Sequence, residues 1–133
     1  MTRLTQQDLE EAAEILRQFN QWESEFDSLM HASDPRVLDR ADIPGLQSRL
    51  STLKASIKAA AKYGTLSGLK HDHSEMERCF FDPAARRAAA HFRAATNSNP
   101  LKKNWVSELY DSRDDISYYR FQLEKFLKDS TTK

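Results

Sequence analysis

The residues whose types and spacing best suit chemistry are Arg86 and His91, which stand five positions apart in the alanine-rich stretch 83–92. At about 100° per residue, an uninterrupted helix would place these two side chains about 140° apart, whereas Arg87 and His91 would share a face. The pattern therefore leaves two interpretations open. Either Arg86 and His91 form a catalytic pair, or Arg87 and His91 form a solvated pair while Arg86 reaches back to Asp82.

The run Arg86-Arg87-Ala88-Ala89-Ala90-His91, in which four residues separate an arginine from a histidine, resembles the signature of the HEPN ribonucleases. That family consists of all-α domains of about this size from toxin and defence systems, in which two subunits bring their motifs together and attack RNA. The resemblance implies that Arg86 and His91 are catalytic residues of a dimer. It covers these few residues and the helical character of the chain.

A second group of chemistry-bearing residues lies in the segment 71–79, which contains every common type of metal ligand. The spacing argues against a compact site, because His71 and His73 are two residues apart and would lie on opposite sides of a helix. The Glu-x-x-His pairs of carboxylate-bridged bundles and the His-Glu-x-x-His motif are both absent. We therefore predict no metal site and no cofactor, with His73 on an apolar face and Cys79 as a small core residue.

Charge is segregated along the chain, although the formal net charge is zero. Residues 1–42 contain four basic and ten acidic residues, a net charge of −6, while residues 43–103 contain eleven basic and four acidic residues, a net charge of +7. The acidic and basic helices could neutralise each other by packing side by side, or each could face its own partner. In the second case, an anion or a nucleic acid would bind the basic side chains of Arg49, Lys54, Lys58 and Lys62.

Apolar residues recur at intervals of three and four along most of the chain, which indicates amphipathic helices. A helix of about 25 residues is predicted after the hydroxyl cap at Thr5, with an inward face of Leu9, Ala12, Leu16, Phe19, Trp22, Phe26 and Met30. A second helix begins at Asp42-Ile43-Pro44, with a seam of Leu46, Leu50, Leu53, Ile57 and Ala60. A third helix is predicted to end near Phe81, and Asp82-Pro83 to begin a fourth.

The last helical stretch, 101–128, is not uniform. Its apolar residues before 111 (Trp105, Leu109, Tyr110) and after 115 (Ile116, Tyr119, Leu123, Phe126) point in different directions, so we predict a kink or a restart at 111–115. Tyr110, Tyr118 and Phe121 form a second apolar face beside the inward one. That face is either packed between two neighbouring helices or exposed as a partner-binding surface.

These elements predict an all-α, single-domain antiparallel bundle of four to five main helices over residues 1–129, followed by a disordered tail at 130–133. The longest apolar run is three alanines, residues 1–30 lack the apolar core of a secretory signal, and there is one cysteine. We therefore expect a cytoplasmic protein that does not span a membrane.

The absence of a glycine-rich phosphate loop and of a nucleophile elbow favours a non-enzymatic function. We expect a protein–protein interaction module of the inhibitor, immunity, antitoxin or adaptor type, which binds another protein through its helix surfaces. Self-association as a homodimer would suit the same aromatic face. The HEPN-like ribonuclease and a nucleic-acid-binding protein that uses the basic segment 49–103 are the alternatives.

Overall fold

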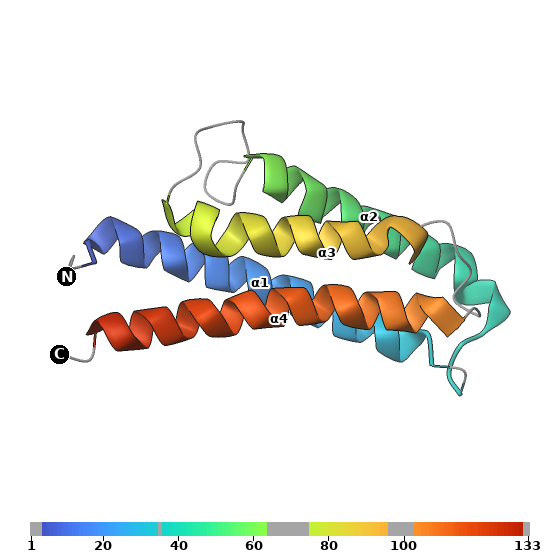
Figure 1. Ribbon diagram of the computed structural model, residues 1–133. Helices are drawn as coiled ribbons and strands as arrows, with labels where there is room; N and C mark the ends of the chain where they lie inside the picture. The colour runs from blue at the N-terminus through green and yellow to red at the C-terminus, as the bar shows by residue number, and fades with distance from the viewer. Residues whose placement is uncertain (1–3, 35, 64–74, 96–102, 132–133) are drawn as a thin grey trace.

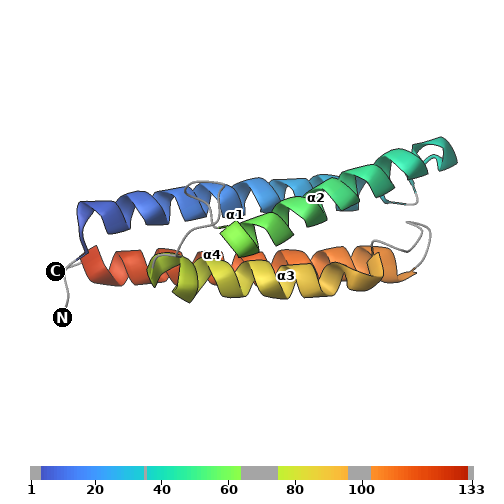
Figure 2. The same ribbon diagram turned by 90° about the horizontal axis from the view of Figure 1, so that it is seen from above.

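The computed structural model describes residues 4–34, 36–63, 75–95 and 103–131. Over these ranges the chain forms four α-helices: α1 (Gln6–Ala32), α2 (Ile43–Tyr63), α3 (Asp82–Ala95) and α4 (Lys103–Thr131). Each helix runs antiparallel to the one before it, and the two termini lie at the same end of the bundle (Figures 1 and 2). Helices α1 and α3 each pack against both α2 and α4. The predicted all-α antiparallel bundle is therefore confirmed, with four main helices in the described part of the chain.

Helix α1 begins where the sequence predicts. The Thr5 hydroxyl accepts a hydrogen bond from the Asp8 amide at 3.0 Å, and the Asp8 carboxylate accepts one from the Thr5 amide at 2.9 Å, which completes a capping box. The buried face consists of Ala12, Ile15, Phe19, Trp22, Phe26 and Leu29. Leu9 was predicted to face inward, but it is 38% exposed, because it lies about 110° from the centre of this buried face.

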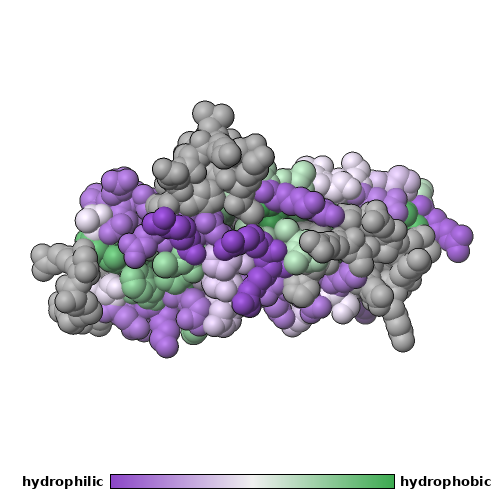
Figure 3. All heavy atoms as spheres, turned by 45° about the horizontal axis from the view of Figure 1, so that its top comes forward, coloured by the Kyte–Doolittle hydropathy of each residue, from purple (hydrophilic) through white to green (hydrophobic). Residues whose placement is uncertain are grey.

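Helix α2 follows a 3₁₀ turn, η1 (Arg40–Asp42), in which the Asp39 side chain caps the amide of Ala41. The predicted seam of α2 is confirmed, because Leu46, Leu50, Leu53 and Ile57 are buried and Ala60 packs against them. In the view of Figure 3, hydrophilic residues cover most of the coloured surface, and the largest apolar patch lies near the end at which α1 begins and α4 ends. The helices are thus amphipathic in the way that their spacing indicates.

The predicted boundary at Asp82-Pro83 coincides with the start of α3, but the helical turns are not interrupted there. A π-helical turn, η2 (Glu77–Phe81), leads directly into α3, and the Asp82 amide donates to the carbonyl of Glu77. A proline inside a regular α-helix removes one hydrogen bond and its ring clashes with the carbonyl four residues earlier. Wider π-turns are one of the means by which a helix continues through such a defect. Pro83 therefore lies in the first turn of α3, in a helical segment that continues from η2 without a gap.

The predicted restart at 111–115 is not observed, because α4 is one α-helix through this segment (Figure 1). Its buried face carries Leu109, Ile116 and Leu123 at intervals of seven, and Ser112 fills the gap between the first two. The kink was inferred by counting Tyr110 as inward, whereas this side chain is 54% exposed. Helix α4 extends to Thr131, so Ser130 and Thr131 of the predicted tail are helical, and residues 132–133 lie outside the described ranges.

An aromatic stack lies at the centre of the core. Phe81, at the end of η2, is fully buried between two side chains of α1, with ring centroids 5.7 Å from Phe19 and 5.5 Å from Trp22. The rings are close to parallel in both pairs, at 17° and 23°. Such stacking adds to the free energy gained by burying the ring area. The last residue of the π-turn, Phe81, therefore lies in the core of the bundle.

Candidate protein-interaction surface

Three aromatic side chains of α4 face away from the bundle. Tyr110, Tyr118 and Phe121 are 54%, 55% and 58% exposed, and they lie on the side of the helix opposite Leu109, Ile116 and Leu123. At about 100° per residue, Tyr110 and Phe121 are about 20° apart and Tyr118 is about 60° from Phe121. The structure thus decides between the two interpretations of this face: it is exposed, and it is not packed between two neighbouring helices.

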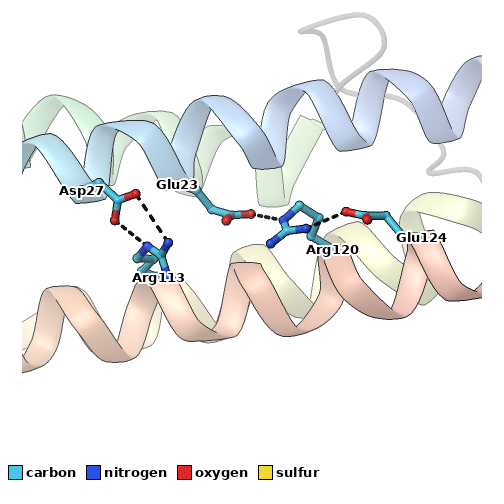
Figure 4. Close-up of polar contacts among 5 residues, drawn as sticks. All are labelled: Glu23, Asp27, Arg113, Arg120 and Glu124. Carbon is cyan, nitrogen blue, oxygen red and sulfur yellow. Dashed lines mark hydrogen bonds and ion pairs between the residues drawn. The ribbon is translucent and has the colours of Figure 1, made fainter.

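Two ion pairs join α4 to α1 in the orientation that leaves these rings exposed (Figure 4). Arg113 Nε donates to Asp27 Oδ1 at 2.6 Å, and Arg120 Nε donates to Glu23 Oε1 at 2.5 Å. The two arginines are seven residues apart, so they lie on nearly the same side of α4 and both meet α1. Two acids of the first helix are therefore paired with arginines of α4.

Arg120 is the centre of the more buried of these pairs. It also donates through Nη1 to Glu124 Oε1 at 2.6 Å, so one guanidinium bridges two carboxylates. Its pKa is raised, first through the hydrogen bond to Glu23 and then through the one to Glu124. Glu23 is only 8% exposed, so its carboxylate depends on this arginine for neutralisation.

On another side of α4, Tyr119 contacts α3. The guanidinium of Arg87 lies 5.9 Å from the centroid of the Tyr119 ring, a cation–π arrangement. Tyr119 in turn meets Tyr118 edge to face, with centroids 5.2 Å apart and planes at 89°. Arg87 thus acts through a half-buried tyrosine on one ring of the exposed face, a role that the sequence did not predict.

Charged residues continue the aromatic face along α4 in both directions. We use the name outer row for six exposed residues that follow one another at intervals of three and four: Asp111, Asp114, Tyr118, Phe121, Lys125 and Lys128. Acids precede the two rings and lysines follow them. Exposed aromatic rings with a polar border are typical of protein interfaces. The sequence indicated the aromatic part of this surface, but not the charged residues that continue it along α4.

The residues proposed for ribonuclease chemistry both belong to α3. Arg86 is exposed, and its Nε donates to the carbonyl of Asp82 at 3.4 Å, which matches the alternative in which Arg86 reaches back to that residue. The side chain of His91 lies outside the described residues, as do His71 and His73. Cys79 is exposed and therefore not the core residue that we predicted.

The predicted anion-binding residues do not share one face of α2. Arg49 points toward α1, where its Nη2 donates to Ser28 Oγ at 2.8 Å. It also lines a groove of about 330 Å³ between α1 and α2, together with Trp22, Thr52 and Ser56. Lys58 is exposed and Lys54 is half-buried, and both lie about 140–180° around the helix from Arg49. The side chain of Lys62 lies outside the described residues.

Two further findings bear on function. Within residues 4–34, 36–63, 75–95 and 103–131, no three His, Cys, Asp or Glu side chains are grouped closely enough to hold a metal ion. In the same ranges, no helix combines the length and the apolar character that crossing a membrane requires.

Comparisons of the chain with protein-family models, with curated proteins and with solved structures found no match. The resemblance to the HEPN ribonucleases thus rests on the spacing of Arg86 and His91 and on the helical character of the chain.

Proposed function

We propose that this protein is a non-enzymatic interaction module that binds another protein through the exposed face of α4. The observation that carries the proposal is the exposure of Tyr110, Tyr118 and Phe121, each more than half accessible, on one face of a well-anchored helix. Exposed aromatic rings cost free energy in water, and their burial in an interface recovers it. Tyrosine and phenylalanine are also among the side chains that interfaces favour.

The anchoring of α4 supports the same conclusion. Arg113 and Arg120 attach the helix to α1, and Arg87 contacts Tyr119 from α3. A surface presented on a rigid helix loses little conformational entropy when a partner binds. The exposed rings are therefore held ready for docking rather than ordered by it.

A nucleic-acid-binding function has less support. Phosphate binding by α2 would need its basic side chains on one face, whereas Arg49 is hydrogen-bonded to Ser28 of α1 on a different side from Lys58. The ribonuclease alternative stays a prediction, because it depends on the side chain of His91. Cytoplasmic action is part of the proposal, as a chain with one cysteine cannot form an internal disulfide.

Affinity capture with structure-matched variants tests the proposal. The wild-type chain, Tyr118→Ala, Phe121→Ala and the control Ser51→Ala, which changes an exposed residue of α2, are each used as bait in a lysate of the source cells. We expect one stoichiometric partner with the wild type and the control, and its loss from both α4 variants. Unchanged circular dichroism spectra must accompany that loss. Equal recovery by all four baits would contradict the proposal.

A further inference from the structure

We propose that the outer row of α4 is a self-complementary seam on which a second copy of this chain docks antiparallel. The two-fold axis would pass between Tyr118 and Phe121. This inference rests on the proposed function, since it uses the same surface, and it names the partner. The arrangement follows from the spacing, the order of charges and the exposure of the six outer-row residues.

The spacing is that of a coiled-coil seam. Intervals of three and four place Asp111, Asp114, Tyr118, Phe121, Lys125 and Lys128 on one stripe, over a helix length of about 26 Å. Helix α4 therefore carries two such stripes. The inner one is already buried against α1 and α3, whereas the outer one is exposed.

The charges along the outer row are complementary to those of a second outer row that runs in the opposite direction. In an antiparallel pair centred between the two rings, Tyr118 lies opposite the second copy's Phe121. The same register places Asp114 opposite Lys125 of the second copy and Asp111 opposite its Lys128. Two-fold symmetry repeats each contact, so four acid–lysine pairs flank four aromatic rings.

The same charges exclude the parallel alternative. A parallel copy would place the two Asp114 carboxylates side by side, and likewise the two Lys125 ammonium groups. Like charges in such positions are unfavourable, and natural coiled coils use this effect to select orientation. The outer row therefore specifies one orientation and one register.

The aromatic rings and the charged residues contribute to the proposed dimer in different ways. Burial of Tyr118 and Phe121 supplies most of the affinity, while exposed ion pairs contribute little each and mainly set orientation and register. A seam on a single helix is small compared with standard interfaces, so we expect a weak dimer with a dissociation constant on the order of micromolar.

A charge exchange between two samples tests the seam. Sedimentation velocity is measured on the full chain as wild type, as Asp114→Lys, as Lys125→Glu, and as an equimolar mixture of the two variants. Each single variant places two like-charged pairs across its own dimer and should dissociate at least about tenfold more readily than the wild type. In the mixed dimer, the lysine introduced at position 114 of one chain meets the glutamate introduced at position 125 of the other. The second contact is the native pair of Lys125 and Asp114, so association should return.

Off-seam charge reversals serve as controls. Glu10→Lys on α1 and Lys58→Glu on α2 change the net charge by the same amounts at exposed positions and should dimerise like the wild type. A wild-type chain that stays monomeric at concentrations on the order of 100 µM would overturn the inference. A mixture that associates no better than its components would also overturn it.

The result also separates this inference from the proposed function. A monomeric chain whose capture of a different protein still depends on Phe121 would refute self-docking and leave the interaction module intact. If the chain is monomeric and no Phe121-dependent partner is found, both proposals fail.

Discussion

Arg120 on α4 donates a hydrogen bond to Glu23 on α1 across 97 residues of sequence, and Glu23 is only 8% exposed. Together with the pair of Arg113 and Asp27, this contact joins α4 to α1 in the orientation that also buries Leu109, Ile116 and Leu123.

Removal of Arg120 should therefore destabilise the fold. Arg120→Met leaves the Glu23 carboxylate buried without its counter-ion, and we expect a loss of about 2 kcal/mol in the free energy of unfolding. Urea denaturation measures the change. Arg17→Met is the matched control, because the Arg17–Glu14 pair is largely exposed and its loss should cost less than about 0.5 kcal/mol. Equal effects of the two substitutions would refute the assigned role of Arg120.

Truncation of Phe81 should reduce the stability of the fold far more than truncation of Phe121. Phe81→Ala removes the ring that stacks on Phe19 and Trp22, and we expect a loss of about 3–5 kcal/mol in stability. Phe121→Ala removes a ring that is 58% exposed, and stability should change by less than about 0.5 kcal/mol. Thermal and urea unfolding of the two variants provide the comparison. A strongly destabilised Phe121→Ala would show that this ring is buried in the monomer.

Ser112 is a buried hydroxyl at the contact between α3 and α4. Its Oγ donates to the carbonyl of Ala88 at 3.0 Å, and it has no exposed surface. Ser112→Leu loses this hydrogen bond and forces a larger side chain between the two helices, so we expect a loss of about 1–3 kcal/mol. Ser24→Leu, at an exposed position of α1, should change the unfolding free energy by less than about 0.5 kcal/mol. A Ser112→Leu variant as stable as the wild type would contradict the close packing of Ser112 between α3 and α4.

Asp34 should titrate far below an ordinary aspartate. Hydrogen bonds from the Arg36 side chain, and then from its backbone amide, lower the pKa of Asp34 to about 2. Because the folded-state pKa is lowered, the contribution of Asp34 to stability is present above the ordinary pKa of about 3.9. It is lost as the pH falls from there toward about 2. NMR titration of the Asp34 carboxyl carbon measures the midpoint, and Arg36→Ala should return it toward the ordinary value.

Local patterns were sufficient to predict the helices themselves. The capping box at Thr5 and Asp8 and the leucine seam of α2 depend on residues within a few positions of each other. The i, i+3 and i+4 spacing of apolar residues, which creates an inward face, can be read directly from the sequence. At Asp82-Pro83 and at 111–115, the helical turns continue where local rules predicted an interruption. The π-turn accommodates Pro83, and Ser112 substitutes for an apolar residue in the buried face of α4.

The sequence by itself determined that this chain forms amphipathic helices, that they assemble into an antiparallel bundle, and that α4 carries more aromatic residues than one buried stripe requires. Only the tertiary structure decided which aromatic residues are exposed, that Arg49 turns toward α1, and that α4 supplies the arginines for Glu23 and Asp27. The physical reason is that periodicity defines stripes on each helix separately. The rotation of each helix about its own axis depends on contacts between side chains far apart in the sequence, such as those separated by 86 and 97 residues.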